Sequence, residues 1–368
     1  MDSKGSCLVM SKRFLFFFLY CAALFHNLFM ALASMKLLCR PFGALVLSSA
    51  SIAKAFSPQK RAPIGVSRFS MSTQVNEKDE DILRVGLCQF QVSPNKEENH
   101  AKCAQFVKRA ADGGAKLVVL PEIWASPYAT AAFPQYAEIL PNLGDDMTQG
   151  LSSSAQLLRE VAMLHKIWLI GGSVAEKDGG KIYNTCLVFS PEGELVGKHR
   201  KAHLFDIDVP GGITFFESET LTAGSSMTDF DTPWCKIGLG ICYDIRFAAY
   251  AMVLAQKGCK ILIYPGAFNM TTGPAHWELL QRARALDNQC YVLTASPART
   301  EAPESEGKYP HYTAWGHSTA VGPWGDVLAS TDEKEDVVIV DLDLSTVEKV
   351  RASIPIMQQK RADLYSVE

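Results

Sequence analysis

The stretch at residues 236–257 limits most strongly what this chain can fold into. Apolar residues separated by small glycines run up to Cys242, and the period then changes to that of a helix. One helical face is shared by Phe247, Ala251, Leu254 and Ala255. A strand that runs into a helix is typical of an α/β fold, and it places Cys242 at the turn between the two elements.

Cys242 has two interpretations at this position. The positive end of the helix and its unpaired N–H groups favour the thiolate form of the side chain. A sharp strand-to-helix turn also pushes the side chain out of the sheet, as in the nucleophile turns of hydrolases. A free cysteine is equally a small hydrophobic residue, so a buried structural cysteine fits the same stretch.

The overall composition is that of an ordinary globular protein, because 48% of the 368 residues are hydrophobic and 20% are charged. A net charge of −3 gives no basic field for nucleic acid. The 10 cysteines include no C-x₂-C pair, so neither a zinc site nor a disulfide framework is indicated. Their dispersed positions indicate free thiols in a reducing compartment.

Residues 1–80 have the composition of a targeting leader outside the folded domain. After Asp2 the first acidic residue is Glu77, and basic residues are spread through the stretch between them. An apolar segment at residues 14–33 has the length of a signal-peptide core or of a membrane anchor. A membrane contact is therefore expected only if the leader is retained.

A second signal-like unit starts at Met35, and a basic tail free of acids follows Phe56. This order resembles the bipartite presequences of algae with secondary plastids, so we expect an organelle, with the plastid favoured. A mitochondrial leader is one alternative, and translation from Met71 with a cytoplasmic product is another.

Residues 81–345 alternate between predicted strands and helices, which favours an α/β domain with covered sheets. Strands are predicted at residues 83–90, 116–120, 167–172, 183–190, 259–264, 289–296 and 337–342. Helices are predicted at residues 95–113, 151–165, 246–257 and 277–288. The pattern also predicts a loop at 206–217, a hairpin at 313–330 and a polar tail, residues 346–368, that packs at a subunit contact.

Two polar residues stand near the ends of predicted strands. Glu122 follows the apolar strand at 116–120, where a carboxylate is costly unless it is paired or used. Lys201 lies in the basic segment at residues 198–203. A surface glutamate and a solvated strand edge are the alternatives. If both residues face Cys242, they supply a base, a cation and a nucleophile.

Three stretches resemble the three motifs of the nitrilase, or carbon–nitrogen hydrolase, superfamily. They are Leu-Pro-Glu at residues 120–122, His-Arg-Lys-Ala-His-Leu at 199–204 and Gly-Ile-Cys-Tyr-Asp-Ile-Arg-Phe at 240–247. The resemblance spans residues 83–345 and implies an α-β-β-α four-layer sandwich that assembles as a homodimer. Within the superfamily, the omega-amidase group is matched best at residues 203–210, 264–282 and 314–319. The sequence departs from that group at residues 212, 249–250 and 301–310, which we expect at the pocket margin or the surface.

The resemblance implies a mechanism that needs no metal and no organic cofactor. Cys242 is the implied nucleophile, Glu122 the general base and Lys201 the cation that stabilises the oxyanion. Tyr243 is implied to add its backbone N–H to the oxyanion site. Glu217 is implied to hold Lys201 and to border the pocket.

The implied substrates are omega-amides of 2-oxo dicarboxylic acids, namely 2-oxoglutaramate and 2-oxosuccinamate. Their free carboxylate needs a cation or N–H donors. Arg246 is one candidate, and the loop that carries Phe268 and Thr272 is another. An ion pair with Asp244 is the alternative for Arg246. Competing functions are an amidase for deaminated glutathione, N-carbamoyl amines or ureido acids, and a non-catalytic scaffold.

Overall fold

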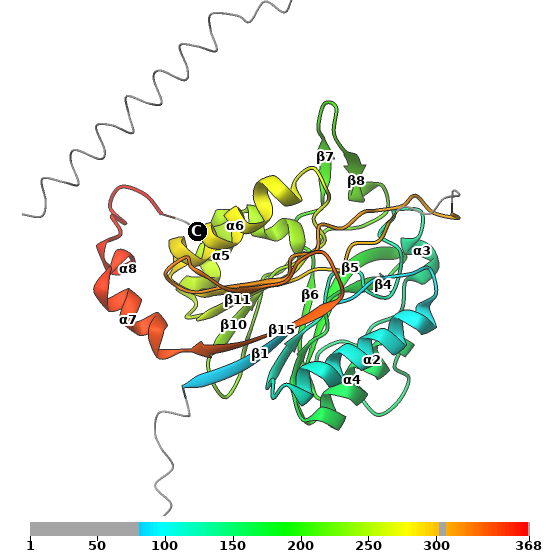
Figure 1. The fold of residues 1–368 in the computed structure, drawn as a ribbon, viewed down its shortest axis with the longest axis horizontal. Helices are drawn as coiled ribbons and strands as arrows, with labels where there is room; N and C mark the ends of the chain where they lie inside the picture. The colour runs from blue at the N-terminus through cyan, green and yellow to red at the C-terminus, as the bar shows by residue number, and fades with distance from the viewer. Residues whose placement is uncertain (1–80, 302–306, 367–368) are drawn as a thin grey trace, which may run out of the picture. The chain divides into compact units, whose positions relative to one another are not determined.

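The computed structural model describes residues 81–301 and 307–366. The predicted leader lies outside these residues, as does part of the predicted loop at 301–310. The described chain forms two large β-sheets with helices against their outer faces (Figure 1).

The first sheet consists of β1 (Ile82–Gln89), β2 (Leu117–Val119), β3 (Trp168–Ile170), β4 (Val174–Asp178), β5 (Lys181–Phe189), β6 (Leu195–Arg200) and β15 (Asp336–Asp343). Strands β1, β2 and β3 are parallel neighbours, and β15 extends the sheet antiparallel to β1. Successive residues of β2 point to opposite faces, so Val118 packs on the helical side and Val119 on the side of the second sheet. The covering helices are α2 (Lys96–Asp112) and α4 (Ser153–His165).

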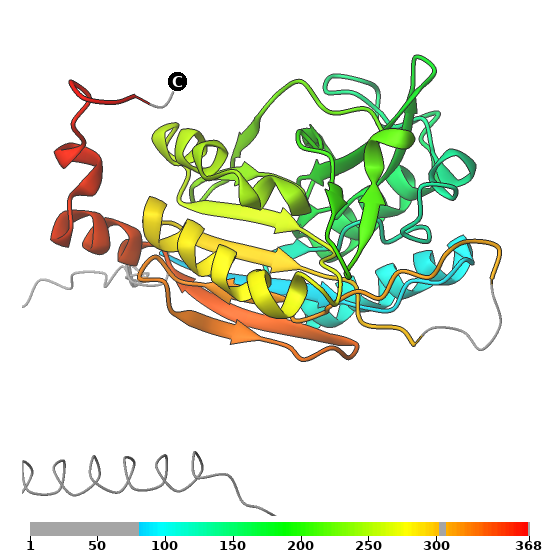
Figure 2. The same cartoon turned by 90° about the horizontal axis from the view of Figure 1, so that it is seen from above.

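The second sheet consists of β9 (Thr228–Asp231), β10 (Lys236–Leu239), β11 (Ile261–Pro265), β12 (Tyr291–Ala295), β13 (Thr319–Val321) and β14 (Val327–Ser330). Its central strands β10, β11 and β12 are parallel. Helices α5 (Ala248–Gln256) and α6 (Gly273–Asn288) lie against its outer face (Figure 2). Gly238 of β10 allows this close contact, because a Cβ there would lie 3.0 Å from Leu254 Cδ1 of α5.

The main hydrophobic core lies between the two sheets. It combines Leu83, Val85 and Leu87 of β1 with Ile237 of β10 and Ile263 of β11, all fully buried. Both sheets are therefore apolar on two faces, which explains why their strands read as nearly continuous apolar runs. The predicted α-β-β-α sandwich is confirmed by this layering.

The predicted loop at residues 206–217 is wrong in part, because it contains a two-stranded hairpin. Strands β7 (Asp206–Asp208) and β8 (Thr214–Phe216) pair antiparallel, and Figure 1 shows them projecting from the body of the domain. Gly211, with φ 70°, lies in the connecting turn. β4 is a strand that the sequence pattern did not predict, since it passes from apolar to charged residues within its length.

The remaining described elements are short or lie in the tail. They are α3 (Phe133–Tyr136), the 3₁₀ turns η2 (Glu217–Glu219) and η3 (Cys242–Arg246), α7 (Ser345–Ser353) and α8 (Ile356–Gln359). Within residues 81–301 and 307–366, no helix has the length and apolar character needed to cross a membrane.

Candidate active site

Glu122 lies directly beyond the carboxyl end of β2 and is fully buried. Its Oε1 accepts hydrogen bonds from Asn184 Nδ2 at 2.9 Å, Lys201 Nζ at 3.0 Å and Tyr128 Oη at 3.2 Å. Its Oε2 accepts from the Ala267 N–H at 2.8 Å. Burial raises the pKa of Glu122, and the charge of Lys201 opposes that rise. Glu122 is fully buried and accepts hydrogen bonds from four donors, so the alternative of a surface glutamate is wrong.

The turn after Glu122 is strained and is held in place by Ser173, which directly precedes β4. Ile123 has φ 49°, which a β-branched residue rarely adopts. Its N–H donates to Ser173 Oγ at 3.0 Å, and the Ser173 N–H donates to the Pro121 carbonyl at 3.1 Å. These contacts fix the direction of the Glu122 side chain.

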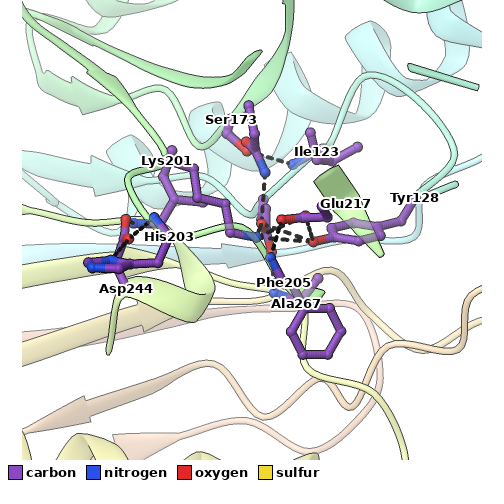
Figure 3. Close-up of polar contacts among 12 residues, drawn as sticks. Ile123, Tyr128, Ser173, Lys201, His203, Phe205, Glu217, Asp244 and Ala267 are labelled. Carbon is purple, nitrogen blue, oxygen red and sulfur yellow. Dashed lines mark hydrogen bonds and ion pairs between the residues drawn. The ribbon is translucent and has the colours of Figure 1, made fainter. Parts of the chain in front are cut away.

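Lys201 follows the end of β6 and is buried between two carboxylates. Its Nζ lies 3.0 Å from Glu122 Oε1. It also lies 2.9 Å from Glu217 Oε1 (Figure 3). Burial alone lowers the pKa of Lys201, but the two carboxylates outweigh it and raise the pKa well above the ordinary value. The solvated strand edge is therefore wrong for Lys201. Its neighbours Lys198 and Arg200 instead pair with Glu176.

Glu217, at the start of η2, is the second fully buried carboxylate of the site. It accepts hydrogen bonds from Lys201 Nζ at 2.9 Å, Tyr128 Oη at 2.6 Å and the Phe205 N–H at 2.7 Å. Figure 3 shows Lys201, Glu217 and Tyr128 converging on one point. The structure thus places Glu217 against Lys201, as the family resemblance implied.

Cys242 begins η3 just beyond β10 and has the left-handed backbone angle φ 46°. Its thiol lies against the Glu122 carboxylate and the Ala267 N–H. Burial, and next the charge of Glu122, raise the pKa of Cys242 well above the ordinary value, while Lys201 opposes them. The prediction that a helix end favours the thiolate is wrong, because a five-residue 3₁₀ turn separates Cys242 from α5, and burial and the Glu122 charge both disfavour the thiolate. The Cys242 side chain therefore has a carboxylate beside it that can act as its base.

Asp244 joins the Cys242 turn to the Lys201 segment, and sequence reasoning missed this role. Its Oδ2 accepts from the Ile241 N–H at 2.9 Å and lies 3.2 Å from His199 Nε2. Its Oδ1 accepts from the His203 N–H at 2.9 Å and lies 2.7 Å from His203 Nδ1. Burial opposes ionisation, but the two histidines and the Ile241 N–H hold the pKa of Asp244 far below its usual range. Figure 3 shows Asp244 and His203 beside Lys201.

Arg246 does not pair with Asp244, so that interpretation is wrong. Its Nη1 lies 3.2 Å from His276 Nδ1, and its guanidinium carbon lies 4.9 Å from the Phe268 ring centroid and 5.6 Å from that of Tyr243. Within the described part of the chain, no carboxylate lies within ion-pair distance of Arg246. Burial lowers its pKa, whereas the nearby Cys242 raises it.

The remaining predicted site residues are Tyr243, implied as an oxyanion donor, and the substrate-binding candidates Phe268 and Thr272. Tyr243 follows the cysteine, and its ring packs edge-on against Phe205 at 5.3 Å. Phe268 and Thr272 are buried. The N–H of Thr272 donates to Asn269 Oδ1 at 2.9 Å, as does that of the preceding residue, so these two donors of the loop are already used. The prediction that the loop offers free N–H groups is therefore wrong at both positions.

A cavity of about 390 Å³ opens onto the site from the side of Tyr128. Glu122, Tyr128 and Ala267 line its inner part. The ring of Tyr128 stacks on that of Tyr312, with 4.6 Å between centroids. Other lining residues are Ser93, Ser126, Thr300, Glu301, Lys308, Tyr309 and His311. Tyr128 and Asn184 were not predicted as site residues, because neither lies in a short sequence motif. Their contacts join segments that are far apart in sequence.

Within residues 81–301 and 307–366, no group of three or more His, Cys, Asp or Glu side chains is placed to hold a metal ion. The seven cysteines of these segments are free thiols, and six of them, including Cys242, are buried.

Comparison with known proteins gives one consistent result. The model of the carbon–nitrogen hydrolase family matches residues 84–352. The chain is 56% identical to the omega-amidase NIT2 of Xenopus tropicalis and 54% identical to that of Homo sapiens, in each case over 78% of this chain and 98% of the relative. It is 41% identical to the crystal structure of Saccharomyces cerevisiae Nit3, a member of branch 10 of the nitrilase superfamily. That match has a TM-score of 0.68 and covers 76% of this chain and 97% of the yeast chain.

The family match covers the segments that carry Glu122, Lys201 and Cys242, and the matched structure has the same layered fold. This chain belongs to the carbon–nitrogen hydrolase family.

Proposed function

We propose that this protein is an omega-amidase that hydrolyses 2-oxoglutaramate and 2-oxosuccinamate to the 2-oxo dicarboxylate and ammonia. The convergence of Glu122, Lys201 and Cys242 in one buried cluster carries the proposal. Identity of 54–56% to omega-amidases over nearly their whole length supports the choice of substrate.

The first half-reaction forms a thioester. Glu122 takes the proton of the Cys242 thiol, and the sulfur attacks the amide carbon as the carbonyl π electrons move to oxygen. The Lys201 ammonium and the Tyr243 N–H stabilise the oxyanion, and one such donor typically contributes about 3 kcal/mol. When the carbonyl re-forms, the C–N bond breaks and Glu122 delivers its proton to the leaving nitrogen, which departs as ammonia.

The second half-reaction releases the acid. Glu122, again a carboxylate, takes a proton from water, and the hydroxyl attacks the thioester carbon. Collapse of this second tetrahedral intermediate breaks the C–S bond, and the sulfur regains a proton from Glu122. The sum is amide plus water to carboxylic acid plus ammonia, and every step uses a group of this chain.

Arg246 is the proposed partner of the substrate carboxylate. It is partly buried, lies close enough to Cys242 for the charge of that residue to raise the pKa of Arg246, and contacts aromatic rings and a histidine. A guanidinium without a carboxylate partner fits an incoming carboxylate through two parallel hydrogen bonds.

Rival activities are separated by their products. Purified protein is offered 2-oxoglutaramate, 2-oxosuccinamate, deaminated glutathione, an N-carbamoyl amine and a ureido acid at equal concentrations. We expect kcat/KM to be highest for the first two, with ammonia and the 2-oxo dicarboxylate in equal amounts. Preference for another member of the set would reassign the substrate, and no turnover of any would support the non-catalytic scaffold.

The proposed partner is a second copy of the chain. Leu279 and Leu286 lie two turns apart on α6 with exposed fractions of 65% and 53%, and Trp324 in the β13–β14 turn is 58% exposed. A groove of about 480 Å³ lies between Leu286, Trp324 and the tail residues Ile354 and Ile356. Exposed large apolar side chains that gather on one face are typical of a subunit contact.

The proposed location of the mature protein is an organelle, with the plastid favoured by the composition of residues 1–80. Mapping the N-terminus of the protein isolated from its own cells tests this. A start near residue 56 or residue 71 supports removal of the leader, and a retained apolar segment at 14–33 would favour membrane attachment.

A further inference from the structure

Tyr128 contacts both carboxylates of the cluster, as Lys201 does, but the mechanism above does not use its hydroxyl. Its hydroxyl lies 2.6 Å from Glu217 Oε1, 3.2 Å from Glu122 Oε1 and 3.4 Å from Lys201 Nζ. A phenol carries one proton, so it donates mainly to Glu217 and secondarily to Glu122.

The charges of the cluster explain why such a bridge matters. Glu122 and Glu217 are two buried carboxylates that share the single ammonium of Lys201. Glu217 raises the pKa of Glu122 by repulsion, after the larger effect of burial. Each neutral donor to this pair stabilises the ionised form of Glu122, which is the form able to accept the proton of Cys242.

We propose that Tyr128 is a positioning residue for the general base, whose hydroxyl bridges Glu122 and Glu217 and keeps Glu122 ionised and aimed at the thiol. This inference rests on the proposed function for the role of Glu122 as base. The ring of Tyr128 has a separate role as cavity wall, since it packs on Tyr312.

The titratable groups that face Tyr128 are Glu122, Glu217, Lys201, Cys242 and Tyr312. Burial, followed by the carboxylates, raises the pKa of Tyr128 well above its ordinary value, so the phenol stays a donor. Tyr312 offers the matched control, because its hydroxyl donates to the Ala267 carbonyl at 2.6 Å and to neither carboxylate.

The test measures the rate at which iodoacetamide alkylates Cys242 as a function of pH, followed by mass spectrometry of the Cys242 peptide in the full-length protein. Tyr128→Phe keeps the ring and removes the hydroxyl. Without this donor the ionised form of Glu122 is less stable, so its pKa rises. The acid limb, which is the low-pH part of the profile where the alkylation rate falls, should move to higher pH by about one unit. Tyr312→Phe leaves the limb in place.

An acid limb of Tyr128→Phe that coincides with that of the wild type, or an equal shift in Tyr312→Phe, overturns the inference. If Tyr128→Phe does not fold, Tyr128→Met fills similar volume without a hydroxyl and gives the same comparison. Alkylation needs no amide substrate, so failure of the wild type to release ammonia from 2-oxoglutaramate would count against the proposed function alone. In an active enzyme, the acid limb of kcat/KM shifts with that of alkylation.

Discussion

At the scale of single residues, the site consists of buried charges that compensate one another. Lys201 lies between Glu122 and Glu217, and all three side chains are fully shielded from solvent. Removing one partner of a buried ion pair leaves an uncompensated charge that costs about 3–5 kcal/mol. Arg246 differs from this group, since it is only partly buried and makes its contacts with aromatic rings and His276.

Arg246→Ala is therefore expected to affect binding of the substrate anion. The KM for 2-oxoglutaramate should rise about 10-fold to 100-fold, as for loss of a hydrogen bond to a charged group. Turnover of a neutral amide such as pentanamide should change much less. Arg282→Ala removes an exposed arginine of α6 and is the control. An unchanged KM in steady-state assays of Arg246→Ala would remove the carboxylate role.

The failure to predict the environment of Arg246 has a geometric cause. Residues two apart in a helical turn do not face each other, so Asp244 and Arg246 point in different directions. Asp244 instead reaches the 199–203 segment, which is distant in sequence. Glu122, Lys201 and Cys242 could be predicted because each lies within a short motif. Tyr128 and Asn184 could not, because their contacts exist only in the fold.

At the scale of elements, two strained turns and the hydrogen bonds of Asp244 position Glu122, Lys201 and Cys242. Ile123, which follows Glu122, and Cys242 itself both have left-handed backbone angles. Gly172 supports the first turn, because a Cβ there would lie 2.1 Å from the Pro121 carbonyl oxygen. Asp244 fixes the second turn against the segment of Lys201. Such geometry persists only when neighbouring contacts enforce it.

Gly172→Ala should lower both stability and turnover. The new methyl group meets the backbone at Pro121, so the free energy of unfolding should fall by about 3 kcal/mol or more, and Glu122 should shift from the thiol. Gly179→Ala is the control, since Gly179 has φ 54° with no atom within 4 Å of the added methyl. It should cost about 1–2 kcal/mol from backbone strain alone. Urea denaturation measures both, and equal losses would contradict the close approach.

Asp244→Asn should weaken the clamp between the two catalytic segments. An amide nitrogen in place of one carboxylate oxygen cannot accept from the donors around it, so unfolding free energy should fall by about 2–4 kcal/mol. Displacement of Lys201 relative to Cys242 should lower kcat at least 10-fold with a smaller change in KM. Asp231→Asn, an exposed carboxylate of β9, is the control. A wild-type kcat in Asp244→Asn would show that the clamp is not needed.

At the scale of the whole molecule, the two sheets bring the ends of their strands to one site. β2 and β6 of the first sheet carry Glu122 and Lys201, and β10 of the second leads into Cys242. Periodicity predicted most of these elements, because strands buried on both faces are continuously apolar. It missed β4, β9 and the β7–β8 hairpin, whose residues are partly charged and whose partner strands cannot be identified from local periodicity.

The apolar outer face of α6 gives a prediction for assembly. Leu286→Lys places a charge between Trp324 and the tail, so a dimer formed through this groove should dissociate. Light scattering after size-exclusion chromatography should give the dimer mass for the wild type and the monomer mass for the variant. Leu164→Lys, at an exposed position on α4, is the control. A dimer that survives Leu286→Lys would place the contact elsewhere.

The most direct test of the thioester mechanism is ammonia release from 2-oxoglutaramate by the wild type, Cys242→Ala and Cys235→Ala. Cys235 is a partly exposed thiol outside the cluster, so its variant controls for loss of a cysteine. We expect rapid release by the wild type and Cys235→Ala, with release by Cys242→Ala reduced to the background. If a folded Cys242→Ala variant still releases ammonia at a rate near that of the wild type, the thioester mechanism is contradicted.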